Sequence, residues 1–321
     1  MSPFRPLFAA VAIAAGVFAP ALSPGADTLP PGPPYRILAQ DKGKVAILDP
    51  RGRVEWEVPL RHTAHDIQLL PNGNILMPTD DVTVVEMTPD KKVVWKHVSE
   101  PAGDDKGKVE IHAFRRLPDG LTMIAESGNK RIIEVDAQDR VVRSIPLVVD
   151  HPNPHRDTRR VRKLANGHYL VCHEADGTVR EYDGAGKVVW SYKLDLAGRP
   201  ATPGHGGHGT EVFNAIRLPD GNTLIAGGNN NRVIEVTPEG QVAWSIGHDE
   251  LPGIKLAWVT SLQRRPNGNV IVGNTHAGPE NPQIFEVTRD KKVVWTFKDF
   301  ATFGNDLCAS EAINVEEGVI R

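Results

Sequence analysis

Short apolar runs alternate with polar turns along almost the whole chain, and one pattern recurs five times. Each repeat holds an apolar run, an Asn-Gly or Asp-Gly turn, a second apolar run, a polar loop, an apolar run ending near glutamate, another turn and a final apolar run. Residues 67–95 read IQLLPNGNILMPTDDVTVVEMTPDKKVVW, and residues 215–244 read AIRLPDGNTLIAGGNNNRVIEVTPEGQVAW. Short apolar runs bounded by turn residues predict β-strands, and no long segment shows the period of an amphipathic helix.

The glycine of the first turn marks the spacing of the repeats. Gly73, Gly120, Gly167, Gly221 and Gly268 are separated by 47, 47, 54 and 47 residues. Asn-Gly and Asp-Gly favour tight hairpin turns, because both central positions need a positive φ. A four-stranded antiparallel unit of this length, repeated radially, is typical of a β-propeller blade.

The two ends of the chain supply the parts of one further repeat. Residues 36–58 match strands two to four of a unit, and residues 310–320 match strand one and its turn. Together they predict an all-β, six-bladed β-propeller, its ring closed by N-terminal strands pairing with the C-terminal strand. We expect residues 35–321 to form this single domain, in which no sheet edge is left open at the junction.

One repeat position is nearly always tryptophan. The residues there are Trp56, Trp95, Trp190, Trp244 and Trp295, while Arg143 occupies it in one unit. Large aromatic side chains at a fixed repeat position are expected to pack between neighbouring blades rather than to stack on a cofactor. Arg143 then predicts a local loss of packing. Trp258 lies outside the set, near the start of an inner strand, where it can line a site.

The N-terminus reads as an export signal. Arg5 precedes a short apolar run, and a small-x-small cleavage site follows, so residues 1–21 are expected to be a cleaved signal peptide. Residues 22–34 form a Pro-rich lead-in, and the predicted location is periplasmic or secreted. The two cysteines, Cys172 and Cys308, are too few for a disulfide scaffold, and the architecture places them far apart.

The composition and charge of the chain limit the classes of molecule that it is expected to bind. The chain is 40% hydrophobic and 24% charged, with a formal net charge of −3. This excludes disorder and argues against a nucleic-acid reader, which would normally be strongly basic. No segment after the signal peptide is apolar enough for stable membrane insertion. A small-molecule ligand and a monomeric state are expected, with a protein partner as a further option.

Polar and titratable residues gather where the inner strands begin. The long connections between blades enter the inner strands on one face, and loops of that length usually serve binding. Repeat alignment places three histidines, His65, His112 and His173, on this rim as catalytic candidates. The ligand-binding candidates on the same rim are Asp66, Arg159, Arg160, Asn214, Glu126, Asn274 and Glu311.

The rim residues allow a metal site or nucleophilic catalysis. The three histidines, with Glu126 and Glu174 as oxygen ligands, would suit zinc, copper or iron. The His-x-x-His pairs at 62–65 and 205–208 fall in loops, where that spacing fixes no geometry. Alternatively, a neutral histidine can accept a transferred group while Arg159 and Arg160 neutralise an anionic substrate. The cofactor is therefore left open, with a divalent metal as one option.

The repeats LPNGN-IL…VVEMTPDKKVVW and LPDGNTLIAGGNNNRVIEVTPEGQVAW resemble those of bacterial PQQ-like β-propeller proteins, within them the six-bladed arylsulfotransferase-like group. The resemblance implies a central histidine as sulfate acceptor, with further His, Asn and Arg residues around it. On the matching positions, His65 and Asp66 open a blade, and His112, Arg159 and His173 accompany them. Quinoprotein dehydrogenases are a poorer match, since they resemble an eight-bladed ring with a vicinal disulfide, so no PQQ is expected.

Three hypotheses follow. The leading one is an exported propeller that binds a small anionic or sugar-like ligand at the long-loop mouth of its channel. The second is an arylsulfotransferase-like or metal-assisted group-transfer enzyme that uses the same residues. The third is a protein-interaction platform, which predicts that exposed apolar loop residues such as Leu251, Pro252 and Ile254 matter more than the mouth.

Overall fold

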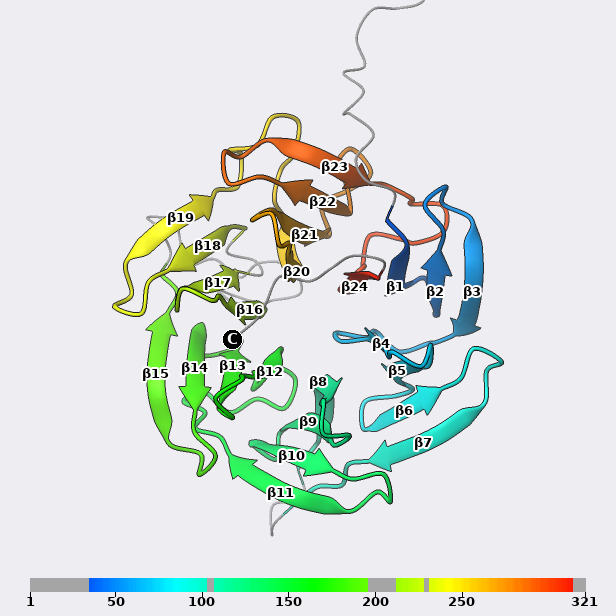
Figure 1. Cartoon of the computed structure of the whole chain (residues 1–321), viewed down its shortest axis with the longest axis vertical. Coiled ribbons are helices and arrows are strands. Elements are labelled where there is room, and N and C mark those ends of the chain that lie inside the picture. The colour runs from blue at the N-terminus through cyan, green and yellow to red at the C-terminus, as the bar shows by residue number, and fades with distance from the viewer. Residues whose placement is uncertain (1–34, 103–106, 196–211, 228–230, 314–321) are drawn as a thin grey trace, which may run out of the picture.

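The computed structural model describes residues 35–102, 107–195, 212–227 and 231–313. These residues form six four-stranded antiparallel sheets arranged as blades around a central axis (Figure 1), and they contain no helix. The all-β, six-bladed propeller predicted from the repeats is confirmed. The predicted signal peptide and lead-in lie outside the described residues, as do residues 314–320 of the predicted closing strand and turn and the pair His205 and His208.

Each blade runs from an inner strand at the axis to an outer strand at the rim. Blade 1 contains β24 (Ala309–Ala312), β1 (Ile37–Asp41), β2 (Lys44–Leu48) and β3 (Val54–Pro59). Blade 2 contains β4 (Gln68–Leu69), β5 (Ile75–Pro78), β6 (Thr83–Met87) and β7 (Val93–Val98). Blade 3 contains β8 (Glu110–Arg116), β9 (Thr122–Ser127), β10 (Arg131–Val135) and β11 (Val141–Pro146).

The remaining blades follow in chain order. Blade 4 contains β12 (Val161–Lys163), β13 (Tyr169–His173), β14 (Thr178–Tyr182) and β15 (Val188–Lys193). Blade 5 contains β16 (Asn214–Arg217), β17 (Thr223–Ala226), β18 (Val233–Val236) and β19 (Val242–Ile246). Blade 6 contains β20 (Trp258–Arg264), β21 (Val270–Thr275), β22 (Ile284–Val287) and β23 (Val293–Phe297).

The ring closes in blade 1, as the sequence predicted. β1 pairs with β2 on one side and with the C-terminal β24 on the other, with Ala39 opposite Ser310 and Leu38 opposite Glu311. The two ends of the described chain are thus joined by one antiparallel ladder. Closure leaves the inner strands of all six blades around the axis (Figure 1).

The core lies between the blades. One apolar cluster combines residues of blades 5 and 6, including Leu224, Val272 and Phe285, with Trp244 packed against it. The predicted role of the tryptophans is confirmed, because each of Trp56, Trp95, Trp190 and Trp244 donates its indole N–H to a backbone carbonyl in the next blade. Their acceptors are Pro89, Asp136, Pro238 and Arg289, at 2.9, 3.2, 2.8 and 2.8 Å.

The predicted loss of packing at Arg143 in blade 3 is wrong, because this side chain takes part in an ionic contact. Its guanidinium donates to the fully buried Glu134 at 2.7 Å, and Lys163 of the next blade reaches the same carboxylate at 2.5 Å. The Tyr169 hydroxyl also donates to Glu134, at 2.6 Å. At this position an ionic contact replaces the aromatic one between blades.

Two further predictions concern thiols and membranes. Cys172 and Cys308 are both buried and free, as expected. In the described ranges no helix is long and apolar enough to cross a membrane.

Candidate functional site

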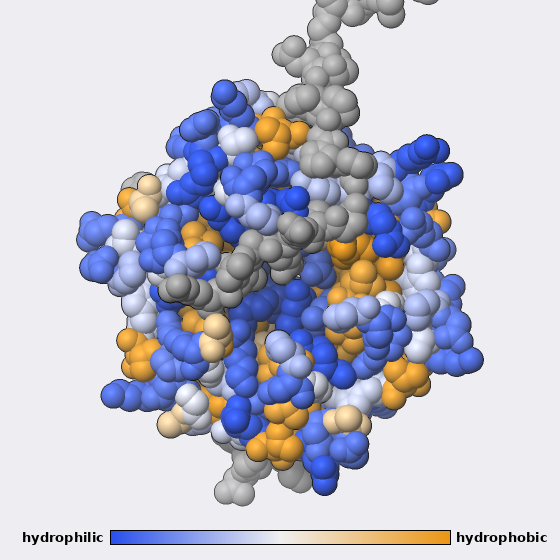
Figure 2. All heavy atoms as spheres, viewed as in Figure 1, coloured by the Kyte–Doolittle hydropathy of each residue, from blue (hydrophilic) through white to orange (hydrophobic). Residues whose placement is uncertain are grey.

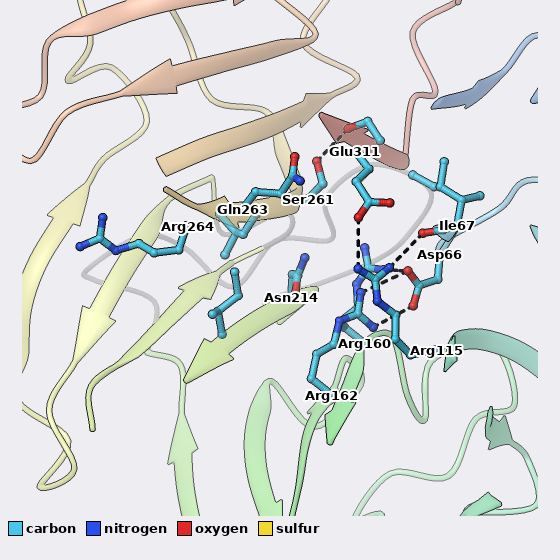
Figure 3. Close-up of a pocket in the computed structure, with 14 residues that line it drawn as sticks. Asp66, Ile67, Arg115, Arg160, Arg162, Asn214, Ser261, Gln263, Arg264 and Glu311 are labelled. Atoms are coloured by element: carbon cyan, nitrogen blue, oxygen red, sulfur yellow. Dashed lines mark hydrogen bonds and ion pairs between the residues drawn. The ribbon is translucent and has the colours of Figure 1, made fainter. Parts of the chain in front are cut away.

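A cavity lies at the hub, where inner-strand side chains from every blade converge (Figure 3). We call it the hub cavity. Its polar lining consists of Asp66, Arg115, Arg160, Arg162, Asn214, Ser261, Gln263, Arg264, Ser310 and Glu311. In the space-filling view, hydrophilic residues gather around the centre of the ring (Figure 2). The cavity therefore presents three guanidinium groups, those of Arg115, Arg160 and Arg162, against two carboxylates. The Arg264 guanidinium points away from them, toward the backbone carbonyls of Arg265 and Asn269.

Asp66 is the centre of the charged group in the hub cavity. Its buried carboxylate accepts hydrogen bonds from Arg162 at 2.9 and 3.2 Å and from Arg160. Burial favours the neutral acid, but the charges of Arg160 and Arg162 outweigh it and hold the pKa of Asp66 below its usual range. Burial also lowers the pKa of Arg162, to about 10, so this guanidinium stays charged at neutral pH.

Arg115 connects this group to the closing strand. It donates to the Ile67 carbonyl at 3.2 Å and to Glu311 at 3.1 Å. On the opposite wall, the Ser261 and Ser310 hydroxyls are 2.9 Å apart. Residues more than two hundred positions apart in sequence thus share one cavity.

A second group lies at the starts of the inner strands. It contains His112 together with His65 and Arg159, which come one residue before Asp66 and Arg160. Arg159 is fully buried; its Nε donates to Glu174, and one terminal nitrogen lies 3.3 Å from His65 Nε2 and 3.2 Å from His112 Nδ1. The two imidazole rings meet edge to face, with centroids 4.7 Å apart. With Glu110 and His155, described next, these three residues form what we call the mouth cluster.

Both histidines facing Arg159 are neutral at neutral pH. Burial, and after it the charge of Arg159, lowers the pKa of His65 well below its usual value and that of His112 to about 4. Two buried polar atoms here, His65 Nδ1 and the second terminal nitrogen of Arg159, have no hydrogen-bond partner among the described residues. Buried polar atoms are rarely left so.

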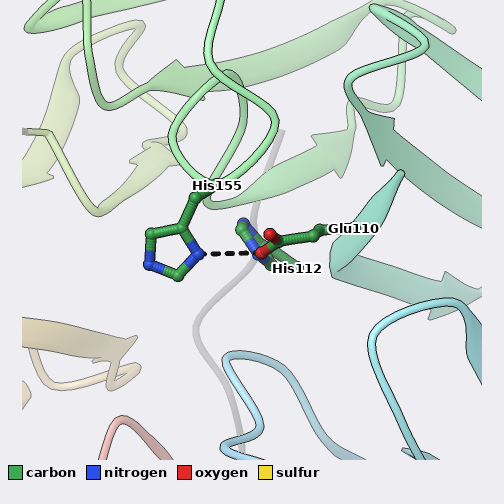
Figure 4. Close-up of side chains that lie close together, drawn as sticks. All are labelled: Glu110, His112 and His155. Carbon is green, nitrogen blue, oxygen red and sulfur yellow. Dashed lines mark hydrogen bonds and ion pairs between the residues drawn. The ribbon is translucent and has the colours of Figure 1, made fainter. Parts of the chain in front are cut away.

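Glu110 and His155 complete the mouth cluster (Figure 4). Glu110 Oε2 lies 2.9 Å from His112 Nε2 and 2.8 Å from His155 Nδ1, while Oε1 lies 2.8 Å from Lys108 Nζ. Burial opposes ionisation, yet these contacts hold the pKa of Glu110 below its usual range. Sequence reasoning missed both residues. Glu110 could have been found, since it lies two residues before His112 and therefore on the same face of an extended strand.

β-Bulges shape the walls of the site. The pairing of β8 with β9 shifts between Ile111 and Ala113, so His112 has no partner on β9. The pairing of β20 with β21 shifts likewise between Val259 and Leu262, where Ser261 turns toward the hub. Such bulges re-aim side chains and are frequent beside functional sites. Gly273 is required opposite, because a Cβ there would lie 2.2 Å from Ser261 Oγ.

The structure brings seven of the ten predicted site residues to the hub or mouth. Asp66, Arg160, Asn214 and Glu311 line the hub cavity. His65, His112 and Arg159 belong to the mouth cluster.

Three predicted residues are used elsewhere. His173 is fully buried in blade 4, its Nδ1 2.8 Å from the Asp157 carbonyl and its Nε2 2.7 Å from the Tyr182 hydroxyl. Both ring nitrogens therefore hold the blade together. Repeat alignment places a residue along a strand but not the partner that captures it.

Glu126 and Asn274 are the other two. Glu126 pairs with Arg131 across the β9–β10 hairpin and accepts from Asn129 at 2.9 Å. Asn274 holds the loop before β20, accepting from the Ala257 N–H at 2.8 Å and donating to the Lys255 carbonyl at 2.9 Å.

The residues that could hold a metal ion also differ from the set that the sequence predicted. Glu174, one of the predicted ligands, pairs with Arg159. Among the described residues, the ligand atoms of Glu110, His112 and His155 lie within 4.8 Å of one another. Trp258 lines no part of the hub cavity; it is buried against Phe213 and stacks on His276.

The apolar loop residues expected to be exposed are mostly buried. Leu251 and Ile254 are 3% and 2% exposed, bridge one another and pack into the core of blades 5 and 6, while Pro252 is exposed. The loop turns its apolar side chains inward because they complete that core. Of the three residues named as examples for the interaction-platform hypothesis, Pro252 alone is exposed.

Comparisons with known proteins identify the fold but no family. No family model matches the chain, and no curated protein matches it either. Among solved structures it is similar to a protein of unknown function from Bacteroides caccae, with 25% identity and a TM-score of 0.72 over 87% of this chain and 98% of that one.

Two lyase structures are more distant. A streptogramin B lyase is 12% identical, with a TM-score of 0.55 over 85% of each chain. An inactive variant of virginiamycin B lyase from Staphylococcus aureus, in complex with quinupristin, is 13% identical, with a TM-score of 0.53 over 84% of this chain and 86% of that one. These two likenesses show the fold alone. The resemblance to PQQ-like and arylsulfotransferase-like proteins is thus supported only as far as the six-bladed propeller.

Proposed function

We propose that this protein binds a small anionic ligand in the central channel, entering through the long-loop mouth. The observation that carries the proposal is the charge of the hub cavity: Arg115, Arg160 and Arg162 face two carboxylates, which leaves a formal charge of +1 (three minus two). Charge of one sign focused in a channel raises the local concentration of counter-ions.

The hub also supplies suitable hydrogen-bond donors. Guanidinium groups bind carboxylate, sulfate and phosphate through paired N–H donors. Arg160 Nε is buried without a hydrogen-bond partner among the described residues. Asn214, Ser261 and Gln263 add neutral polar groups to the same wall, which fix the orientation of a ligand.

The test is a thermal-shift titration of the full chain with sulfate, phosphate, citrate and benzoate, together with neutral sugars as the alternative ligand class. Sulfate and phosphate stabilise many proteins without a site, so the signal is a shift that saturates at low concentration. We expect it in the wild type and in the exposed-surface control Arg140→Gln, and at least a tenfold weaker midpoint in Arg162→Gln. A shift in Arg162→Gln equal to that of the wild type would refute the proposal.

Group transfer is the second candidate function. It is favoured by the neutral state of His65 and His112 beside the Arg159 guanidinium, since a neutral imidazole next to a cation can accept a group from an anionic donor. We expect turnover of p-nitrophenyl sulfate with a phenol acceptor, lost in His65→Ala. An inactive wild type discards this candidate and leaves anion binding untouched.

We also propose export to the periplasm or medium, from the sequence of residues 1–21. N-terminal sequencing of the protein from an expressing bacterium is expected to begin after the cleavage site near Ala21. A cell-associated protein that retains Met1 would overturn this.

A further inference from the structure

We propose that Glu110, His112 and His155 form a binding site for a divalent transition metal, with zinc as the best fit. The three groups offer Glu110 Oε2, His112 Nε2 and His155 Nδ1, all within 4.8 Å of one another. Two imidazoles and one carboxylate are a ligand set that zinc accepts where a fourth position stays open. The inference goes beyond anion binding in the hub cavity and does not depend on it.

The orientation of His112 supports this assignment. Its Nδ1 lies 3.0 Å from the Thr158 carbonyl oxygen, the shorter of its two polar contacts, so we assign the ring proton to that bond. Metal-bound histidines usually hold their second nitrogen in this way. The lone pair of Nε2 then faces Glu110 Oε2 at 2.9 Å, and a cation between these two acceptor atoms would satisfy both.

The other two ligands, Glu110 and His155, are positioned by contacts but can still move. Lys108 binds the other oxygen of Glu110 at 2.8 Å, which leaves Oε2 for the two imidazoles. A tetrahedral zinc with bonds of about 2.0–2.2 Å keeps its donors roughly 3.3–3.5 Å apart. The two distances from Glu110 Oε2 to the histidines, 2.9 and 2.8 Å, must therefore lengthen by roughly half an ångström. The side chain of His155 is 50% exposed on a loop, so it can move and also leaves an entry path.

His65 lies beside this site. Its ring is 4.7 Å from that of His112 and 6.3 Å from that of His155, centroid to centroid, and its buried Nδ1 has no hydrogen-bond partner among the described residues. This unsatisfied nitrogen is a second, independent sign of a missing ligand. The neighbouring charge of Arg159 is balanced by its ion pair with Glu174.

The test uses the full chain without a polyhistidine tag, treated with chelator and titrated with zinc chloride by calorimetry. We expect one zinc per chain in the wild type. Affinity should fall at least tenfold in His155→Ala and in Glu110→Gln. The matched control is His151→Ala, another histidine of the same loop paired with a carboxylate, Asp176, at 3.0 Å, which should bind zinc within twofold of wild type.

Cobalt substitution gives a second readout, since a tetrahedral site with these ligands is expected to produce a visible absorption band that His155→Ala removes. Thermal melting of each apo variant confirms that it folds. The proposal is overturned if the wild type binds no stoichiometric zinc, if His155→Ala binds as tightly as wild type, or if affinity is lost only in a His205→Ala, His208→Ala double variant. A failure here leaves the Arg162 experiment unaffected.

Discussion

Gly128 holds two parts of the candidate site together. It lies at φ +87°, and a Cβ on it would sit 2.1 Å from the Lys108 carbonyl oxygen, next to the start of β8. Its N–H donates to Asp157 at 2.9 Å, and Asp157 in turn caps the loop that carries His155. Only a residue without a side chain lets the segment before Glu110 and this loop approach so closely.

We therefore expect Gly128→Ala to destabilise the protein by about 1–3 kcal/mol, from both backbone strain and the clash. Urea denaturation measures the loss. Gly120→Ala is the matched control: its φ is also +87°, but nothing lies within 4 Å of its added Cβ, so it should lose less. Equal losses in the two variants would show that the approach to Lys108 is unimportant.

His173 predicts a pH dependence of stability. Burial, as the largest cause, lowers its pKa from 6.5 to about 4. Between pH 6.5 and about 4 the unfolded chain therefore binds a proton that the folded chain excludes, so the stability present above pH 6.5 is lost as the pH falls. For this group the loss approaches about 3 kcal/mol, at 1.36 kcal/mol per pKa unit. Urea midpoints measured across this range should fall less steeply in His173→Gln, and equal slopes would contradict the assignment.

At the scale of elements, blades 2 to 5 each meet the next blade through a buried glutamate and a cation. Glu86 pairs with Arg116 of the following blade at 2.8 Å, and Glu181 pairs with Arg217 at 2.7 Å. These arginines also lie over the tryptophans Trp95 and Trp190, with centroid distances of 5.3 and 4.5 Å. Each contact neutralises the glutamate and buries the aromatic face at once. Blade 3 keeps the glutamate but replaces tryptophan by Arg143.

The substitution Glu134→Gln tests the ionic contact that Glu134 makes with Arg143 and Lys163. The change removes the charge shared by Arg143 and Lys163 in a fully buried position, so we expect about 1–3 kcal/mol lower stability by urea denaturation. Glu55→Gln is the control, because the Arg36–Glu55 pair is exposed and should contribute about 0–1 kcal/mol. A Glu134→Gln loss no larger than that of the control would mean that packing alone joins these blades.

At the scale of the whole molecule, closure makes the hub. β24 supplies Ser310 and Glu311 to the cavity and pairs with β1, so one ladder both ends the ring and completes the site. The described chain is joined there without a covalent bond. Stability and ligand binding should therefore depend on the same four residues, Ala309–Ala312.

A chain truncated before Ala309 is expected to lose cooperative unfolding or to aggregate, because it exposes the edge of β1 and the apolar residues beside it. Thermal melting followed by circular dichroism, with light scattering, measures both outcomes. Ser310→Ala, which removes only the bond to Ser261, should melt close to the wild type. A truncated chain that melts like the full chain would show that the ring does not need its closing strand.

The repeat pattern is enough to predict the blades, their number, their closure and the packing of the tryptophans. These follow from local patterns, since strand alternation, Gly turns and a regular spacing act within some fifty residues. Repeat alignment also found most of the hub, because equivalent inner-strand positions meet at the axis.

Which of the rim residues lie together depends on contacts that form only in the folded chain. His173 and Asn274 share the rim with His65 but are captured by partners within their own blades, whereas Glu110 and His155 join His112 from a strand start and a loop. The physical reason is that hydrogen bonds and ion pairs depend on sub-ångström placement. Bulges, close approaches at glycine and inter-blade contacts set that placement, and the repeat pattern predicts none of them.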